Sequence, residues 1–435
     1  MGNYIPDTKE ERREMLERVG VKSVDDLYVM VPEEVRKEDF DLPEGRSEME
    51  VRELLEKMAA GNTVYHSIFR GAGSYHHYIP SIVKRVLSKE EFLTAYTPYQ
   101  AEISQGILQS IFEYQTQICE LTGMDVSNAS VYDGAVAAAE GILMCPDRKR
   151  SEVLIPENTD PEVLAVIQTY LESRSIPLVS VKTKDGLIDE EDLKEKLNEK
   201  TACLFVQSPN YYGLIEDVEA LTETAHEKGA KVVEYAEPIS LALLKTPGEM
   251  GVDIAVGEGQ PLGLPMSFGG PYLGFMACKK ELMRKLPGRI VGQTKDHEGR
   301  RAYVLTLQAR EQHIRREKAS SNICSNEALC AMTASVYMAA MGPEGLHDTA
   351  LHCLNNAHLL ERELAKLGFE RVYPGEFYQE FLTTSPIEPK MLEEKLREKG
   401  ILMGQILGDK ILWCATEMNG KEKIEELLDA IREVL

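Results

Sequence analysis

Residues 91–145 read EFLTAYTPYQAEISQGILQSIFEYQTQICELTGMDVSNASVYDGAVAAAEGILMC, and the rest of the chain is interpreted around them. The middle of this stretch has apolar residues three to four positions apart, which predicts an amphipathic helix that buries one face. Gly123 follows the last of them and suits the left-handed residue that often ends a helix. The apolar positions of the predicted helix are Ile103, Ile107, Leu108, Ile111, Phe112, Ile118 and Leu121.

Two segments of different character flank the predicted helix. On its N-terminal side, Phe92–Gln100 holds three aromatic residues, two threonines and a proline in nine positions, which favours a fixed surface loop over a helix or strand. On its C-terminal side, a turn at Ser127–Ser130 leads to a second helix that starts at Asp133-Gly134. That helix begins with small residues, which would let a ligand or another backbone approach closely.

From residue 150 to residue 290, short apolar runs alternate with charged helical stretches. This alternation predicts strand–helix–strand units and an α/β domain with a mostly parallel sheet. Ligands on such sheets bind beyond the carboxyl ends of the strands, which places Ser208–Tyr211 and Tyr235–Pro238 at the edge of a candidate site. The predicted strands are Val153–Ile155, Leu178–Val181, Ala202–Val206, Lys231–Tyr235, Asp253–Val256 and Leu273–Ala277, with helices at Asp189–Glu199 and Asp217–Gly229.

The two ends of the chain have their own patterns. Residues 1–60 predict two helices, the first opened by a capping box from Thr8 to Glu11. A connector over residues 290–330 concentrates basic side chains, and a long apolar helix follows from Asn326. A smaller α+β unit then closes with an amphipathic helix over Lys421–Val434. The basic residues of the connector are Arg300, Arg301, Arg310, His313, Arg315, Arg316 and Lys318.

Composition narrows the classes of function. The chain has 435 residues, 49 of them basic and 72 acidic, and its net charge of −23 argues against nucleic acid and anionic membranes as partners. No apolar run approaches the roughly 18 residues of a membrane span, and we expect no secretory signal. The eight cysteines form no C-x-x-C pair, so we expect neither a disulfide framework nor a zinc site, and a cytoplasmic location.

The segment GAGSYHHYIP at residues 71–80 invites a metal interpretation through His76 and His77. Adjacent histidines point in different directions, however, and no carboxylate cluster stands nearby in the sequence. We therefore expect no metal site, and a loop that is packed or faces a functional site instead.

Three segments carry a resemblance to a known family. TAYTPYQAEISQGILQ (94–109), ASVYDGAVAAAE (129–140) and AREQHIRREKASSNIC (309–324) resemble the glycine cleavage system P-protein, and the likeness covers essentially the whole chain. In particular the chain resembles subunit 1, the half that pairs with a separate pyridoxal-phosphate-bearing subunit 2 where the enzyme is split into two chains.

The resemblance implies an α/β fold of the fold-type-I pyridoxal phosphate enzymes. Such a fold has a large domain with a mostly parallel sheet flanked by helices, and a smaller C-terminal α+β domain. We therefore expect an N-terminal helical arm at 1–75, a large α/β domain at 76–320 and a small α+β domain at 321–435.

A pyridoxal phosphate enzyme needs a lysine for the Schiff base, an acid for the pyridine nitrogen and an anion site for the phosphate. In similar enzymes the lysine precedes a Gly-rich segment, and counting back from Pro265 puts Gln260 there, where an amide cannot form the imine. The acid position after the strand at Lys231–Tyr235 offers only Glu237. At the helix start expected to hold the phosphate, Asp133 would cap the N–H groups itself and repel a dianion.

We therefore expect no cofactor-binding residues in this chain. The alternative is that the register is misplaced and that a lysine elsewhere serves. The lysines nearest to the expected position either come too early or follow the strand at Leu273–Ala277: Lys245, Lys279 and Lys280.

The resemblance also implies a role in glycine decarboxylation. Pyridoxal phosphate would sit on the partner, glycine dehydrogenase subunit 2, where glycine would lose its carboxylate as CO₂, and the aminomethyl group would pass to the lipoyl arm of H-protein. This chain would be inactive alone and would complete the active site in a heterotetramer of two copies of each subunit. We expect it to contribute the loop residues Tyr96, Thr97, Tyr99 and Gln100 to the partner's active site.

Other interpretations stay open. The loop residues could pack inside this subunit instead. Arg310, His313, Arg315 and Arg316 could meet a carboxylate or phosphate, or form a basic face that is solvated or salt-bridged. The chain could also be a non-catalytic scaffold or regulatory subunit of the same complex, or a self-sufficient pyridoxal phosphate lyase, which an absorbance band of the internal aldimine would reveal.

Overall fold

The computed structural model describes residues 7–37, 41–93, 97–323 and 326–435. Internal contacts divide the chain into two compact units, Met1–Thr63 and Val64–Leu435. The first unit carries the helices α1 (Lys9–Val19) and α2 (Glu48–Ala59), with 3₁₀ turns at Asp25–Tyr28 and Glu33–Val35.

Both helices of the first unit start at complete capping boxes. The Thr8 hydroxyl accepts from the Glu11 N–H while the Glu11 carboxylate accepts from the Thr8 N–H, and Ser47 and Glu50 repeat the arrangement. The capping box predicted at Thr8 is confirmed. No residue of α1 or α2 is buried, so these helices are stabilised by local capping rather than by a core within the unit.

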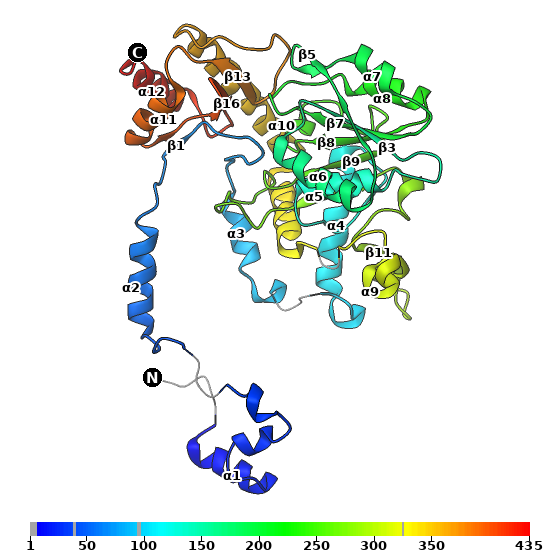
Figure 1. The fold of residues 1–435 in the computed structure, drawn as a ribbon, viewed down its shortest axis with the longest axis vertical. Helices are drawn as coiled ribbons and strands as arrows, with labels where there is room; N and C mark the ends of the chain where they lie inside the picture. Colours follow the sequence, from blue (N-terminus) through cyan, green and yellow to red (C-terminus); the bar gives the residue numbers. More distant parts are fainter. Residues whose placement is uncertain (1–6, 38–40, 94–96, 324–325) are drawn as a thin grey trace. The chain divides into compact units, whose positions relative to one another are not determined.

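The second unit is built on a seven-stranded sheet, of which Figure 1 labels β3, β7, β8 and β9. The strand order is β2-β10-β9-β8-β7-β3-β4. Strands β9, β8, β7, β3 and β4 are parallel, and β10 runs antiparallel to both of its neighbours. The mostly parallel sheet is therefore confirmed. The strands are β2 (Val126–Ser127), β3 (Glu152–Pro156), β4 (Leu178–Val181), β7 (Thr201–Ser208), β8 (Lys231–Ala236), β9 (Ile254–Glu258) and β10 (Gly274–Cys278).

Both faces of this sheet are buried, as continuous apolar strands in a parallel sheet require. Leu154 and Leu204 pack on one face, with helices α4, α8 and α10, while Val153 and Phe205 pack on the other, with α5 and α6. The helices of this unit up to the long α10 are α3 (Ser81–Leu87), α4 (Gln105–Thr122), α5 (Gly134–Leu143), α6 (Pro161–Ser173), α7 (Glu190–Lys196), α8 (Val218–Glu227), α9 (Gln312–Arg315) and α10 (Ala328–Ala365).

Helix α4 is the helix predicted from residues 103–121. It ends at Gly123, whose φ of 68° is left-handed, as expected from the sequence. One position was wrong: Ile103 is 80% exposed and lies in the 3₁₀ turn Ala101–Ile103. The tighter winding of that turn takes its side chain off the apolar face that α4 buries.

Residues 290–306 form a hairpin, so the prediction of a connector is wrong for this part. Strands β11 (Ile290–Lys295) and β12 (Arg301–Thr306) pair antiparallel. Two glutamines of α4 hold them: Gln115 exchanges hydrogen bonds of 2.9 and 3.0 Å with the backbone of Val291, and Gln105 exchanges two of 2.9 Å with that of Tyr303. These bonds fix the hairpin to the helix that precedes the sheet.

The C-terminal part of the second unit has its own small sheet. Strands β13 (Glu380–Thr384), β16 (Lys410–Cys414) and β15 (Gln405–Leu407) pair antiparallel around the fully buried Trp413, with helices α11 (Pro389–Glu398) and α12 (Lys421–Arg432). The predicted terminal helix is confirmed. Strand β1 (Ser67–Ile68) pairs with β14 (Ile401–Leu402), so the blue segment near the start of this unit lies beside its orange C-terminal part (Figure 1).

Short elements complete the fold. Strands β5 (Thr183–Lys184) and β6 (Leu187–Ile188) pair with each other. Helix α10 kinks at Gly342, directly before Pro343. In the part of the chain that the structure describes, no helix is long and apolar enough to cross a membrane. The remaining 3₁₀ turns are Glu90–Phe92, Ser240–Ala242, Lys280–Leu282, Gln308–Arg310 and Arg316–Lys318.

Candidate functional site

The carboxyl ends of β7, β8 and β9 meet at a small cavity of about 30 Å³. Both segments predicted at the site edge take part, Ser208–Tyr211 through Pro209 and Tyr235–Pro238 through all four of its residues. Three carboxylates line the cavity, and no lysine or arginine is found among the described residues of its wall. The lining residues are Gly73, Tyr75, Asp160, Gln207, Pro209, Tyr235, Ala236, Glu237, Pro238 and Glu258.

Gln260, predicted at the lysine position, lies two residues beyond β9 and is 1% exposed. Its Oε1 accepts from the Tyr75 N–H at 2.9 Å, and its Nε2 donates to the carbonyl oxygens of Tyr75 and Leu264 at 3.0 and 2.8 Å. Both donors and the acceptor of the amide are therefore engaged with backbone. The side chain ties the segment at residues 71–80 to the end of β9.

Two carboxylates occupy the start of α5. Asp133 is the N-cap residue, and its Oδ1 accepts from the Val136 N–H at 2.8 Å. The Gly134 N–H donates to Oε2 of Glu258 at 2.9 Å. These are N–H groups of the first turn that have no partner within the helix and would otherwise face an anion.

Glu258 also closes the end of β9. Its Oε1 accepts from the N–H groups of Gln260 and Leu273 at 2.9 and 3.0 Å. Burial raises the pKa of Glu258 to about 7, against the effect of its three backbone N–H donors. This side chain holds the start of α5, the end of β9 and the start of β10 together.

Glu237, the predicted acid after β8, is directed into a turn. Its two oxygens accept from the N–H groups of Ile239 and Ser240 at 3.1 and 2.6 Å. Burial raises its pKa, while the nearby His77 and these N–H groups act in the opposite direction. Both oxygens therefore stabilise the chain reversal after β8.

The third carboxylate of the wall, Asp160, and a buried acid outside it, Glu380, add to the acidic surroundings of the cavity. Burial raises the pKa of Asp160, and it raises the pKa of Glu380 to about 7. Glu380 accepts from the Tyr75 hydroxyl and from the Ala72 N–H, both at 2.7 Å. The segment that contacts Gln260 is thus held to β13 as well as to β9.

The lysines considered as substitutes lie elsewhere. Lys279 directly follows β10, whose last residue pairs with Ile254 at the amino end of β9, the end opposite to Glu258. Its Nζ donates to the Gly251 carbonyl and lies 3.3 Å from Asp253 Oδ1. Lys245 forms an ion pair with Glu219.

The loop predicted to reach a partner is described only from Thr97 onward, and Tyr96 lies outside the described residues. Tyr99 is 55% exposed and Gln100 is exposed. Thr97 is half-buried, and its Oγ1 has no hydrogen-bond partner among the described residues. The Tyr99 hydroxyl accepts from Arg289 Nη2 at 3.1 Å.

The basic segment lies beside this loop. The ring of His313 and the ring of Tyr99 have their centroids 6.3 Å apart, and His313 Nδ1 is 3.5 Å from a Glu311 oxygen. Arg310 is half-buried and donates to the Gly288 carbonyl at 2.8 Å. The two remaining arginines predicted as anion ligands, Arg315 and Arg316, are exposed.

Two residues of this geometry, Glu258 and Arg289, were missed from the sequence. Glu258 is a carboxylate at the end of an otherwise apolar buried strand, and Arg289 is an arginine between Gly288 and the apolar start of β11. A charged residue that adjoins a buried strand is the signal that could have found both, because burial of a charge needs partners.

The histidine segment does meet one carboxylate, which the sequence argument did not foresee. His77 Nδ1 lies 2.8 Å from Glu417 Oε2, and the Cys353 thiol donates to the same oxygen at 3.4 Å. The ligand atoms of this buried group, in which a metal ion could bind, all lie within 4.8 Å of one another. Glu417 was missed because it comes from the other end of the chain.

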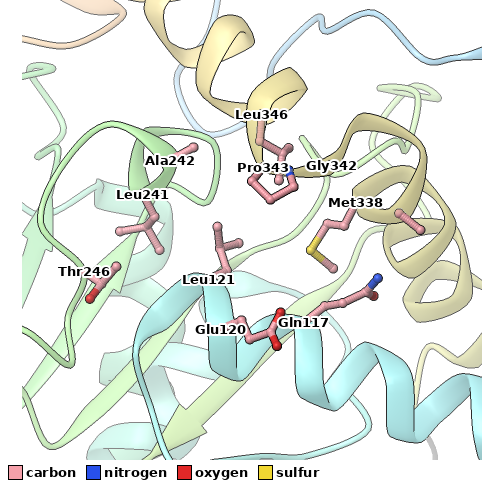
Figure 2. Close-up of a pocket in the computed structure, with 11 residues that line it drawn as sticks. Gln117, Glu120, Leu121, Leu241, Ala242, Thr246, Met338, Gly342, Pro343 and Leu346 are labelled. Carbon is pink, nitrogen blue, oxygen red and sulfur yellow. The ribbon is translucent and has the colours of Figure 1, made fainter.

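A separate open pocket of about 480 Å³ lies between α4, the kink of α10 and the turn Ser240–Ala242 (Figure 2). Its wall is mostly apolar, with Gln117, Glu120 and Thr246 among its polar residues. It shares no lining residue with the cavity at the strand ends.

Comparison with known proteins connects this geometry to a family. The glycine cleavage system P-protein family matches residues 2–431. The probable glycine dehydrogenase (decarboxylating) subunit 1 of Desulfitobacterium hafniense is 45% identical over 444 residues, which cover 99% of this chain and 100% of that protein. The protein of the same name from Desulforamulus reducens is 49% identical over 436 residues, which cover 98% of each.

Solved structures support the same family and show the same fold. The crystal structure of glycine decarboxylase (P-protein) of the glycine cleavage system, in inhibitor-bound form, matches with a TM-score of 0.95 at 44% identity over 100% of both chains. The glutamate decarboxylase of Lactobacillus brevis matches with a TM-score of 0.68 at 12% identity, over 92% of this chain and 95% of its own, which shows the fold alone. The expected fold-type-I architecture is confirmed. The chain belongs to the glycine cleavage system P-protein family.

Proposed function

We propose that this chain is the cofactor-free subunit of a two-chain glycine decarboxylase. The relatives described above are named subunit 1, which implies a partner subunit 2. The observation that carries the proposal is Gln260, which stands at the expected lysine position with its amide bonded to the backbone of Tyr75 and Leu264. An amide cannot form an imine with the aldehyde of pyridoxal phosphate.

The other residues of this chain also do not fit pyridoxal phosphate. Asp133 and Glu258 accept from the N–H groups at the start of α5, where a phosphate would bind, and their carboxylates would repel it. The cavity of about 30 Å³ is far smaller than the roughly 300 Å³ at which pockets for small molecules begin. The cofactor chemistry is therefore assigned to subunit 2.

The exposed loop supports a role across an interface. Tyr99 is 55% exposed, and the neighbouring Gln100 is exposed as well. Exposed aromatic residues such as Tyr99 are enriched where subunits meet, so the loop favours a surface that another subunit covers. In the complex this loop would orient groups at the active site of subunit 2.

The activity of the complex is glycine decarboxylation followed by transfer of the aminomethyl group to the lipoyl arm of H-protein. Reconstitution tests this: subunit 2 is assayed for glycine–CO₂ exchange with H-protein, with and without this chain. We expect exchange only when both subunits are present. Full exchange by subunit 2 alone would overturn the proposal in favour of a scaffold or regulatory subunit.

The loop is tested by removing one hydroxyl at a time. Tyr96→Phe and Tyr99→Phe should lower exchange by about 10- to 1000-fold, or about 1.4–4 kcal/mol of transition-state stabilisation, without loss of assembly. Tyr28→Phe is the matched control, because Tyr28 has the same exposed fraction as Tyr99, 55%. Full activity of both loop variants would remove the loop from the active site.

The absence of the cofactor from this subunit has its own test. The isolated chain is incubated with pyridoxal phosphate, reduced with borohydride and digested. We expect no pyridoxyl-peptide, whereas a stoichiometric label on any lysine would favour a self-sufficient lyase.

A further inference from the structure

Arg289 is a buried charged side chain that pairs with no carboxylate among the described residues. It is 3% exposed, and within the described ranges its guanidinium bonds to the Asn326 Oδ1 at 3.2 Å and to the Tyr99 hydroxyl at 3.1 Å. Its Nε has no hydrogen-bond partner there. Burial of a cation without a counter-charge disfavours folding, so an arginine at this position needs a reason other than stability.

Hydrogen bonds hold the backbone of Arg289 in place. Its carbonyl accepts from the Ala129 N–H at 2.7 Å, and Asn326 Nδ2 donates to the Ala129 carbonyl at 3.0 Å. Gly288, just before it, has a φ of 74° and approaches Asn128 so closely that an added Cβ would lie 3.2 Å from the Asn128 amide nitrogen. The arginine therefore extends to the exposed loop from a backbone segment before β11 that is bonded to the turn leading into α5.

The contact between Arg289 and Tyr99 leaves the Tyr99 hydroxyl free to donate a hydrogen bond. The phenolic oxygen accepts from Arg289 Nη2, and the guanidinium carbon lies 5.4 Å from the ring centroid. The hydroxyl proton of Tyr99 has no acceptor among the described residues. A hydroxyl that accepts from a cation becomes a stronger donor, because hydrogen bonds in a chain polarise one another.

We propose that Arg289 is a positioning residue that presents the Tyr99 hydroxyl as a hydrogen-bond donor to a carboxylate outside this chain. The acceptor is a carboxylate because the positive charge behind the phenol favours a negative acceptor over a neutral one. Glu311, a buried carboxylate of the neighbouring basic segment, lies 3.5 Å from His313, and no ion pair joins it to Arg289 among the described residues. The inference rests on the proposed function, since the carboxylate belongs either to glycine or to an acidic side chain of subunit 2.

A double-mutant cycle in the reconstituted complex tests the coupling. Arg289→Gln should lower kcat/KM for glycine–CO₂ exchange by about 10- to 100-fold in the wild-type background and by less than about 3-fold in the Tyr99→Phe background. Arg289→Lys should recover part of the loss, because it keeps the charge. Arg301→Gln is the matched control, because it also removes one positive charge beside a tyrosine ring. Arg301 starts β12, and its guanidinium carbon lies 5.8 Å from the ring centroid of Tyr303.

The two sources of the carboxylate give different results. If glycine supplies it, Arg289→Gln raises the KM for glycine and leaves the affinity between the subunits unchanged. If a side chain of subunit 2 supplies it, the dissociation constant of the complex rises instead. Equal fold losses in both backgrounds of the cycle, or no loss at all, would overturn the inference.

A readout independent of catalysis separates this inference from the proposed function. The chain is labelled with 3-fluorotyrosine, and the Tyr99 resonance is assigned by its disappearance in Tyr99→Phe. We expect that ¹⁹F resonance to shift in Arg289→Gln and Arg289→Lys and to stay in place in Arg301→Gln. An unmoved resonance in a folded Arg289 variant would show that Arg289 does not hold Tyr99, whether or not the wild-type complex is active.

Discussion

Gln260 and Tyr75 are joined by two hydrogen bonds that run in opposite directions. The Tyr75 N–H donates to Gln260 Oε1 at 2.9 Å, and Gln260 Nε2 donates to the Tyr75 carbonyl at 3.0 Å. The side-chain amide thus pairs with a backbone segment as a neighbouring strand would. It does so at the position where a pyridoxal phosphate enzyme of this fold is expected to carry its lysine.

Restoring a lysine there should not create a cofactor site. In Gln260→Lys the Tyr75 N–H loses its acceptor, which costs about 1–3 kcal/mol of folding free energy. The adjacent carboxylate of Glu258 favours the protonated amine, and an ammonium group does not attack an aldehyde. We expect a lower melting temperature and no pyridoxyl-peptide after borohydride reduction. Decarboxylation by this variant without subunit 2 would contradict the prediction.

Glu234 should make stability fall as the pH rises. It lies on β8, is 2% exposed, has one oxygen without a hydrogen-bond partner in the described part of the chain, and burial raises its pKa from 4.5 to about 8. A raised folded-state pKa contributes stability that is complete below pH 4.5 and is lost as the pH rises through about 8.

Glu234→Gln stays neutral at every pH and should remove this dependence. We expect the variant to match the parent near pH 4.5 and to be more stable by about 1–3 kcal/mol at pH 8.5, as measured by denaturant unfolding. Glu223→Gln, at an exposed position on α8, is the control. A stability difference that does not change with pH would refute the assignment to Glu234.

The pair His77–Glu417 should show the opposite pH dependence. Burial raises the pKa of Glu417, but the hydrogen bonds from His77 and the Tyr78 N–H outweigh it and leave the pKa below 4.5. The stability from this carboxylate is present above pH 4.5 and is lost as the pH falls below it. Glu417→Ala should cost about 3–5 kcal/mol at pH 7, and less as the pH is lowered.

Thermal melting at pH 7 and at pH 3 checks this prediction. Glu394→Gln, at an exposed position in the middle of α11, should leave both melting temperatures unchanged. A loss in Glu417→Ala that is the same at both pH values would mean that packing, and not the ionised carboxylate, is responsible.

Thr97→Val should separate stability from activity. The Thr97 hydroxyl is buried without a partner among the described residues. Its removal should lower the free energy of unfolding of the isolated chain by less than about 1 kcal/mol, or raise it. In the reconstituted complex the variant should lose glycine–CO₂ exchange if the loop rearranges on assembly and exposes this hydroxyl to subunit 2. Thr159→Val deletes another unpartnered hydroxyl, outside the loop, and should leave exchange unchanged.

Local patterns were enough to predict much of the fold. The apolar spacing and Gly123 predicted α4 and its end, and the run at Leu178–Val181 predicted β4 to the residue. The capping box at Thr8 predicted the start of α1. Strand alternation, together with the family resemblance, directed attention to Gln260 and Asp133, which both lie by the end of β9 and the start of α5.

What the sequence by itself determined was therefore most of the strands of the large sheet, several of the helices, and the chemical nature of single positions. The tertiary structure alone decided which side chains meet: Glu417 with His77 across 340 positions, Arg289 with Tyr99 across 190, and Glu258 with Gly134 across 124. Periodicity and capping act over a few neighbouring residues, so they are visible in one dimension. A contact between distant positions depends on how the sheet, hairpin and helices pack, and no local pattern carries that information.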